Sequence, residues 1–329
     1  MADRLGWGII ATGSIAHAFA KGLKASKTGE LVVSGSRSLE KAKKFAKEHG
    51  GKAVGSYEEV LADPKVQAVY IATPHHLHYE WTIKAAEAGK AILCEKPFTL
   101  NAIEAQRALN EVKRHKVFFM EAFMYRASPQ TRKVLELVRE GAIGKVLAVN
   151  AEFGFAAGRE WDNFRADGAV GGGGLMDVGT YCVSFIRAVV GEEPVEAHYV
   201  LDKTEKDYDA SGAGILKFPG GAVATFGTGV HVQWKNDARI YGESGRIEID
   251  SPWTPNENSE IRVTRNGGEP ETLKLGGDNL YGGEADAVAE FLSKREAPYM
   301  TVQDTLDNMR ALDMLRASAG FKFAAEQSA

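Results

Sequence analysis

The sequence predicts an α/β protein: a doubly wound parallel sheet followed by an α+β part with a large, mainly antiparallel open sheet. In the first third of the 329 residues, buried strands alternate with amphipathic helices, as in βαβ units. Beyond Glu121 the pattern changes, and strands joined by glycine-rich turns dominate. The length suits two domains, which we expect at residues 1–122 and 123–329.

The composition narrows the classes of function. With 44% hydrophobic residues the chain can bury a real core, and its net charge of −4 argues against nucleic-acid or anionic-membrane partners. Cys94 and Cys182 lie in segments that read as buried, which favours a reducing compartment over a disulfide framework. The start lacks the apolar core of a signal peptide, and no stretch is long and apolar enough to span a bilayer. We therefore expect a cytoplasmic protein.

The first element is a buried strand, Leu5–Thr12, that turns into a helix. A dinucleotide-binding turn needs small residues where the backbone turns tightly, where it meets the pyrophosphate and where the helix packs on the strand. Ala11, Gly13 and Ala16 occupy these places. Because alanine replaces glycine twice, a tight turn in an unrelated α/β protein remains an alternative.

The second strand, Leu31–Ser36, ends in Ser36 and Arg37, and Ser38 can cap the helix that follows. A site specific for NAD usually carries an acidic residue about 20 positions after the glycine turn. A hydroxyl followed by a guanidinium suits a 2′-phosphate better. We therefore expect NADP, with NAD as a weaker alternative; an ordinary solvated Arg37 is the other interpretation.

The next strand, Val66–Thr73, opens into a loop that holds His75, His76 and His78. With no cysteine or carboxylate ligand close by in the sequence, we predict cofactor contact or helix capping here and no metal. A helix over His78–Ala88 follows.

The central strand, Ala91–Glu95, presents Glu95 and Lys96 immediately before Pro97. Open α/β sheets bind ligands at the carboxyl ends of their strands, so we expect chemistry at Lys96. A surface ion pair closing an edge strand is the alternative. A helix over Leu100–His115 and a strand over Val117–Ala122 complete this half.

In the second half, Ser128 and Pro129 predict the start of a helix that runs to Glu140. Strands are then expected at Lys145–Phe155, Val195–Leu201, Ala213–Phe218, Ala222–Val230, Ala238–Tyr241 and Arg246–Asp250. Amphipathic segments at Glu284–Lys294 and Val302–Ala319 end the chain, and we expect the last helix to pack back on the first domain.

A four-glycine run precedes the most informative helix, which begins at Leu175. Its core stripe is expected at Leu175, Val178, Cys182, Phe185 and Val189. On its flank, Asp177 and Tyr181 are four residues apart, so a carboxylate can orient or tune a phenol that exchanges a proton. A buried structural Tyr–Asp pair is the alternative.

These motifs resemble the Gfo/Idh/MocA oxidoreductase family. They are Thr12–Ala16, Ile71–Pro74 with His78, Glu95–Pro97, and Gly173–Tyr181. The resemblance covers nearly the whole chain; Ala11 replaces the usual glycine, a departure that we expect to cost little because alanine is the next smallest residue. It implies a Rossmann domain, a second domain whose open sheet often forms a dimer, and reversible hydride transfer between NAD(P) and a carbinol carbon of a sugar or polyol.

Carried over by position, the resemblance makes Lys96, Asp177 and Tyr181 the catalytic residues, with Lys96 beside nicotinamide. It implies cofactor binding by Ala11, Thr12, Gly13, Ser14, Ile15, Ser36, Arg37, Ala72, Thr73, Pro74, His75, His78, Glu95, Lys96 and Arg165. The run Met120–Arg126 resembles the branch of NADP-dependent D-xylose dehydrogenases and dimeric dihydrodiol dehydrogenases. We expect an aldose rather than a diol as substrate, and a homodimer.

Several alternatives stay open. Tyr181 and Lys96 could exchange their roles in moving the hydroxyl proton and stabilising the oxygen's charge. A regulator that senses NADP without catalysis, or a sugar oxidoreductase that keeps its cofactor tightly bound, would carry much of the same sequence. Recognition of the substrate is expected to involve loop residues such as Phe153, Phe155, Arg159 and Trp161.

Overall fold

The computed structural model describes residues 4–158, 160–276 and 279–323, which form two compact units. The first unit takes the described residues of Met1–Thr99, Ile103–Ala127 and Asn279–Leu306. The second takes those of Leu100–Ala102, Ser128–Asp278 and Asp307–Ala329. Neither unit is continuous in sequence, because a late segment of the chain returns to the first one.

The first unit contains a six-stranded sheet in the order β3-β2-β1-β4-β5-β6, in which every pairing is parallel. The strands are β1 (Leu5–Ile10), β2 (Gly29–Gly35), β3 (Lys52–Val54), β4 (Ala68–Ile71), β5 (Ala91–Glu95) and β6 (Phe119–Ala122). The helices in this part of the chain are α1 (Ser14–Ala25), α2 (Leu39–His49), α3 (Tyr57–Ala62), α4 (His78–Glu87) and α5 (Ala102–His115). The predicted doubly wound parallel sheet is confirmed. Strand β3 and helix α3 were not expected, because they are too short to show a hydrophobic period.

Helix α8 (Leu280–Phe291) packs on α1, although more than 250 residues separate them in the sequence. The two helices approach closely at Gly22, where a Cβ would lie 2.5 Å from the Cβ of Tyr281. Asn279 caps α8 and also donates from its amide to the carbonyl of Gly22 at 2.6 Å. This cap explains why the helix begins four residues earlier than its apolar pattern predicts.

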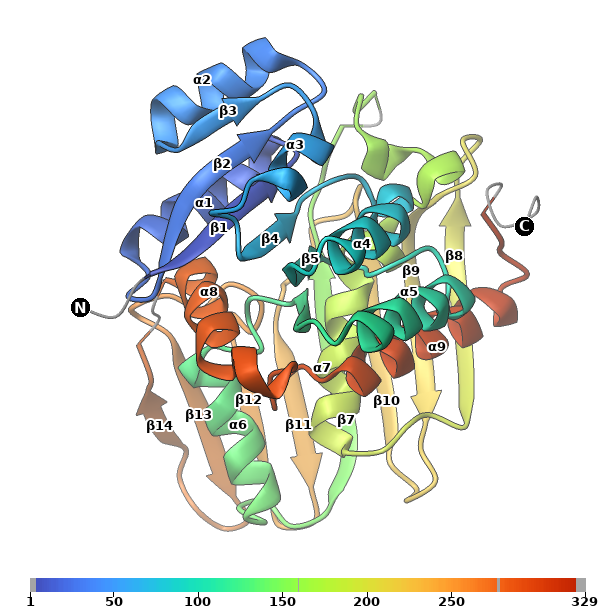
Figure 1. Ribbon diagram of the computed structural model, residues 1–329. Coiled ribbons are helices and arrows are strands. Elements are labelled where there is room, and N and C mark those ends of the chain that lie inside the picture. Colours follow the sequence, from blue (N-terminus) through green and yellow to red (C-terminus); the bar gives the residue numbers. More distant parts are fainter. Residues whose placement is uncertain (1–3, 159, 277–278, 324–329) are drawn as a thin grey trace. The chain divides into compact units, whose positions relative to one another are not determined.

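The second unit contains an eight-stranded sheet in the order β14-β13-β12-β11-β7-β10-β9-β8 (Figure 1). Its strands are β7 (Val146–Gly154), β8 (Glu196–Lys203), β9 (Asp209–Lys217), β10 (Val223–Gly229), β11 (Ala238–Gly242), β12 (Gly245–Ile249), β13 (Glu260–Arg265) and β14 (Glu271–Lys274). Only the pairing of β7 with β10 is parallel, so the predicted mainly antiparallel sheet is confirmed. Strands β13 and β14 extend it beyond the predicted elements.

Helices cover one face of this sheet. Helix α7 (Thr180–Val190) packs on β7, and α6 (Pro129–Arg139) packs on α7 (Figure 1). The hydroxyl of Ser128 accepts a hydrogen bond from the Thr131 amide at 3.2 Å, as the sequence predicts for a cap. On the opposite face apolar side chains are exposed, with Val200 at 78% and Ile215 at 48%.

Helix α9 (Val302–Ser318) begins in the first unit and continues into the second. Among the described residues, no helix is long and apolar enough to cross a membrane. Cys94 and Cys182 are both buried free thiols.

Candidate active site

In the first unit, the predicted cofactor residues follow the carboxyl ends of four parallel strands, β1, β2, β4 and β5. The strand order reverses between β1 and β4, which are neighbours in the sheet. Open α/β sheets bind ligands beside such a reversal. The sheet thus brings these residues to one edge, although they are spread over 86 positions, from Ala11 to Lys96.

The turn after β1 has the backbone of a dinucleotide-binding turn. Ala11 has φ +75°, Gly13 is the exposed N-cap of α1 with open space where a Cβ would lie, and Ala16 is fully buried. Thr12 and Ser14 flank Gly13 at the start of the helix, where free backbone N–H groups favour an anion. The left-handed backbone at Ala11 costs a residue with a Cβ roughly 1–2 kcal/mol, a strain that the small size of alanine does not remove.

In the turn after β2, Ser36 and Arg37 differ in their exposure to solvent. Ser36 is buried, and its hydroxyl accepts a hydrogen bond from the Ser38 amide at 3.3 Å, whereas Arg37 is exposed. The guanidinium of Arg37 lies near the Tyr57 hydroxyl: burial raises the pKa of this phenol, and Arg37 partly offsets the rise. Arg37 is therefore held by α3 while it remains accessible to an anion.

The turn after β4 is tied to the turn after β5 by His78. Its two ring nitrogens lie 2.8 Å from the carbonyl of Thr73 and 2.9 Å from that of Pro97. Burial lowers the pKa of His78 to about 4, so at neutral pH the ring has one proton and donates to one of the two carbonyls. Ala72 and His75 are also buried here, and the Thr73 hydroxyl is buried without a hydrogen-bond partner among the described residues. An unsatisfied donor in this turn fits a polar ligand at the edge.

Glu95 and Lys96 are buried, at 7% and 8% exposure. Strand β5 lies between β4 and β6, so it is an inner strand, and Lys96 follows its carboxyl end. The alternative of a surface ion pair closing an edge strand is therefore wrong. A buried lysine at the ligand-binding edge of a sheet is a candidate for chemistry.

Two side chains that act on Glu95, the phenol of Tyr70 and the carboxyl of Glu284, were not predicted from the sequence. The Tyr70 hydroxyl donates to the Glu95 carboxylate, and burial raises the pKa of Tyr70. The carboxyl of Glu284 on α8 is buried, with neither oxygen hydrogen-bonded to a described residue, and burial together with the charge of Glu95 raises its pKa. No local pattern identifies them, because one lies in an ordinary apolar strand and the other comes from α8, near the end of the chain.

In the second unit, the structure brings two predicted site residues together. The Arg165 Nε donates to the Asp177 Oδ1 at 2.9 Å, and Asp177 is only 3% exposed. The Asn163 side chain accepts from the Arg165 amide at 3.1 Å, and the guanidinium lies over the Phe164 ring. Arg165, predicted as a cofactor contact, thus provides a counter-charge for the predicted catalytic carboxylate.

The segment that carries Asp177 is a π-helical turn, Leu175–Gly179, and α7 begins only at Thr180. The prediction of one regular helix is wrong here. Its expected core stripe is buried, but so is the flank with Asp177 and Tyr181, because the segment is enclosed on all sides. The sequence distinguished a buried stripe from a more polar flank, but in the structure both are buried, so the helix has no exposed polar face.

Tyr181 is held by aromatic neighbours. The ring of Phe153 meets it edge-on at 5.2 Å, and that of Trp253 lies 6.1 Å away. The Trp253 indole donates to the Glu152 carbonyl at 2.8 Å, which fixes this ring in turn. Phe153, expected to recognise substrate, is in the structure a packing neighbour that positions Tyr181.

Asp209 anchors the start of the π-helical turn. Its Oδ2 accepts from the Leu175 amide at 2.7 Å and from the Tyr199 hydroxyl at 2.6 Å. Burial raises the pKa of Asp209 to about 6, although these donors lower it. A Cβ at Gly173, where φ is +118°, would lie 1.9 Å from Asp209 Oδ1, so this contact explains one glycine of the four-glycine run. Asp209 is 34 residues from Leu175 and could not be predicted from the motif.

The loop before this helix has an aromatic cluster of its own. Phe155 and Trp161 meet edge-on at 5.5 Å and pack on Ala166, Tyr208 and Val230. The predicted loop residue Arg159 lies outside the described residues.

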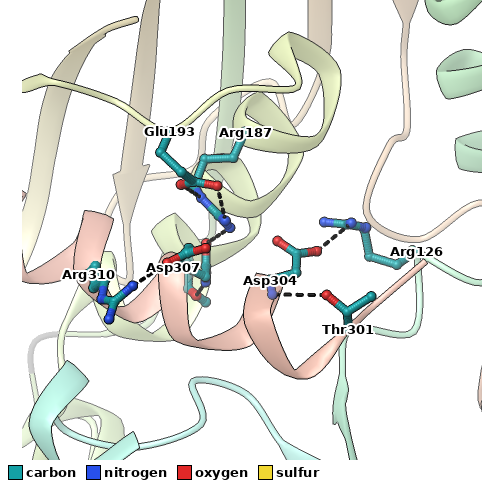
Figure 2. A network of polar contacts seen from close by, with 9 residues as sticks. Arg126, Arg187, Glu193, Thr301, Asp304, Asp307 and Arg310 are labelled. Atoms are coloured by element: carbon teal, nitrogen blue, oxygen red, sulfur yellow. Dashed lines mark hydrogen bonds and ion pairs between the residues drawn. The ribbon is translucent and has the colours of Figure 1, made fainter. Parts of the chain in front are cut away.

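Ion pairs of buried arginines support each unit separately (Figure 2). In the second unit, the Arg187 guanidinium makes two hydrogen bonds of 2.6 and 2.7 Å to Glu193, and the Asn308 amide donates to the Thr180 hydroxyl at 3.1 Å. In the first unit, Arg126 pairs with Asp304 at 2.6 Å. Arg126, the last residue of the run Met120–Arg126, thus serves the fold by holding the start of α9.

Comparisons with known proteins agree along the whole chain. Residues 5–123 match the model of the Gfo/Idh/MocA oxidoreductase family with NAD-binding Rossmann fold, and residues 131–248 match the Gfo/Idh/MocA C-terminal domain. The chain is 32% identical to trans-1,2-dihydrobenzene-1,2-diol dehydrogenase of Bos taurus, over 97% of this chain and 98% of the relative.

Two solved structures resemble it over their full length. KijD10, a 3-ketoreductase from Actinomadura kijaniata in complex with NADP and TDP-benzene, is 27% identical, with a TM-score of 0.89. An aldose-aldose oxidoreductase from Caulobacter crescentus complexed with glycerol is also 27% identical, with a TM-score of 0.88. Each alignment covers 96% of this chain and 98% of the other. The turn, the buried lysine and the matched domains together show that this chain belongs to the Gfo/Idh/MocA family of oxidoreductases.

Proposed function

We propose that the protein is an NADP-dependent dehydrogenase that transfers hydride between nicotinamide and the carbinol or carbonyl carbon of a sugar or related polyol, with an aldose oxidised at C1 as the first candidate. The observation that carries this proposal is the burial of Glu95 and Lys96 at the carboxyl end of β5. The dinucleotide-type turn follows the carboxyl end of β1 in the same parallel sheet. In this proposal the first unit binds the dinucleotide, and the second binds substrate and forms a homodimer. The buried free cysteines suit a cytoplasmic location.

The residues present fit a dinucleotide. Gly13 leaves open space at the start of α1, Thr73 offers an unsatisfied hydroxyl, and Arg37 offers an accessible guanidinium. These groups would meet the pyrophosphate, a polar part of the cofactor and the 2′-phosphate in that order. When bound, the cofactor would accept hydride at nicotinamide C4.

Side chains of the protein must accept the hydroxyl proton of the substrate and stabilise the negative charge that develops on its oxygen. As the carbinol C–H bond breaks and hydride leaves, the hydroxyl proton passes to a base, and the carbon–oxygen bond becomes a carbonyl. We assign Tyr181, acting as the phenolate, as the proton acceptor, and Lys96 as the positive charge that favours this phenolate and the developing charge on the substrate oxygen. The exchange of these roles remains the alternative. Asp177, paired with Arg165, would orient the substrate or Tyr181. The family's motifs support the assignment of Lys96 and Tyr181 to one substrate.

The chemical assignment is tested by Lys96→Met and Tyr181→Phe. Each should lower kcat by about a hundredfold or more while leaving the protein folded, because each removes a positioned charge or proton carrier. Lys217→Met and Tyr241→Phe, both at exposed positions of the second sheet, are matched controls that should keep their turnover. Near-normal turnover of either site variant would remove that residue from the mechanism.

The choice of cofactor is tested at Arg37. Each charge-assisted contact to a phosphate is worth about 1.5–3 kcal/mol, or roughly ten- to more than a hundredfold in affinity. Arg37→Ala should therefore weaken NADP by this factor and spare NAD, and adding Ser36→Asp should favour NAD through charge repulsion. Comparative kinetics with both cofactors decide this. Equal use of NAD and NADP by the wild type, or equal losses in the variant, would refute the assignment.

A trans-dihydrodiol is the second candidate substrate, favoured by the relative from Bos taurus, which carries that activity in its name. A screen of aldoses, polyols and dihydrodiols with NADP and NAD would separate the two. Denaturing the purified protein and measuring released NADP distinguishes a tightly held cofactor, which would appear in stoichiometric amount, from an exchangeable one.

A further inference from the structure

Two histidines and a glutamate form a cluster on the first unit that the proposed reaction does not use. His17 comes from α1, while Glu48 and His49 are the last two residues of α2. The His17 Nδ1 lies 2.7 Å from the His49 Nε2 and 3.4 Å from the Glu48 Oε2. The His49 Nε2 lies 3.3 Å from the Glu48 Oε1. One ligand atom from each of the three side chains can thus be chosen so that all three lie within 4.8 Å of one another.

These three ligand atoms fit a transition-metal ion. Zinc binds imidazole nitrogen at about 2.0–2.1 Å and carboxylate oxygen at about 2.0–2.2 Å, which places tetrahedral ligand atoms roughly 3.3–3.5 Å from one another. The two contacts between imidazole and carboxylate, 3.4 Å to Oε2 and 3.3 Å to Oε1, already have this length but end on different oxygens of Glu48. A rotation of the carboxylate would bring one oxygen to both imidazoles, and the nitrogen–nitrogen separation of 2.7 Å must open by roughly 0.6–0.8 Å. We propose that His17, Glu48 and His49 bind a Zn²⁺ ion, with water in the fourth position, and that the ion links α1 to α2.

The surroundings allow an ion to enter and favour its ligands. The side chains of His17 and Glu48 are 35% and 50% exposed, so the site is open to solvent. Two imidazoles and a carboxylate select zinc, copper or nickel over magnesium or calcium, which prefer oxygen ligands.

Other features limit the affinity. The positive charges of Lys21 and Lys24 act on His49 and oppose a cation, and Lys24 donates to the Glu48 carbonyl at 2.9 Å. The His49 Nδ1 is buried without a hydrogen-bond partner among the described residues. When Nε2 ligates a metal the ring proton must sit on Nδ1, where it finds no acceptor. The site is therefore expected to exchange its zinc and not to be required for folding.

The test is a zinc titration of the full-length protein, prepared without a histidine tag and stripped with a chelator, in competition with a chromophoric chelator. The wild type should bind one equivalent, and zinc should raise its melting temperature. His17→Ala and Glu48→Gln, both at accessible positions, should each weaken this binding by at least about tenfold, since each removes one of three ligands.

Glu196→Gln is the matched control, because the exposed pair of His198 and Glu196, 2.9 Å apart, is a histidine–carboxylate pair in the second unit. This variant should bind zinc as the wild type does. Replacing zinc with Co²⁺ adds a readout independent of activity: the wild type should show the visible absorption of tetrahedral cobalt, and His17→Ala should lose it. Failure of the wild type to bind one equivalent, or undiminished binding in His17→Ala, would overturn the proposal.

Discussion

The buried carboxyl of Asp209 should make the stability of the protein depend on pH in a direction opposite to that of most carboxylates. Its pKa is about 6 in the folded protein, against an ordinary value of 3.8, chiefly because burial disfavours the charged form. Between these values the folded state holds a proton that the unfolded state has lost, so the free energy of unfolding falls as the pH rises. The full loss above pH 6 is roughly 3 kcal/mol, of which about 1.4 kcal/mol appears between pH 5 and pH 7.5.

Asp209→Asn removes this dependence, because the carboxamide oxygen still accepts from the Leu175 amide but cannot ionise. Urea unfolding of wild type and variant at pH 5 and pH 7.5 gives the measurement. The stability of the variant relative to the wild type should rise by about 1.4 kcal/mol over this range, and any constant change in hydrogen bonding cancels in the comparison. Asp202→Asn, at an exposed position on β8, controls for the loss of one carboxyl. A relative stability that is independent of pH, or that falls as the pH rises, would refute the reasoning.

Two further predictions concern packing and assembly. Gly173→Ala should lower the free energy of unfolding by about 1–3 kcal/mol from backbone strain alone, and by more as the new Cβ displaces Asp209. Gly283→Ala, where a Cβ would meet nothing within 4 Å, should leave stability unchanged or raise it by up to about 1 kcal/mol; equal losses would contradict the argument. We also expect a homodimer through the exposed face of the second sheet, so Val200→Asp should yield the 35.6 kDa monomer in sedimentation while Ile103→Asp, in the first unit, should not. A wild type that sediments only as monomer at micromolar concentration would exclude this dimer.

The sequence alone determined the features that depend on neighbours along the chain. Alternating apolar strands and amphipathic helices predicted the parallel sheet, because their period is set by local geometry. Ser38 and Ser128 predicted two helix starts, since a cap bonds to an amide three residues on. The order of the motifs predicted the family, which the matched domains and relatives confirm.

Tertiary structure decided what depends on residues far apart. Lys96 is buried because β5 is an inner strand of the sheet, and strand order cannot be read from a strand's own residues. The partner of Asp177 is Arg165, and the start of its helix is held by Asp209, 32 residues further on. Hydrogen bonds and ion pairs act over about 3 Å in space and carry no period along the chain, so only the folded arrangement can assign these partners.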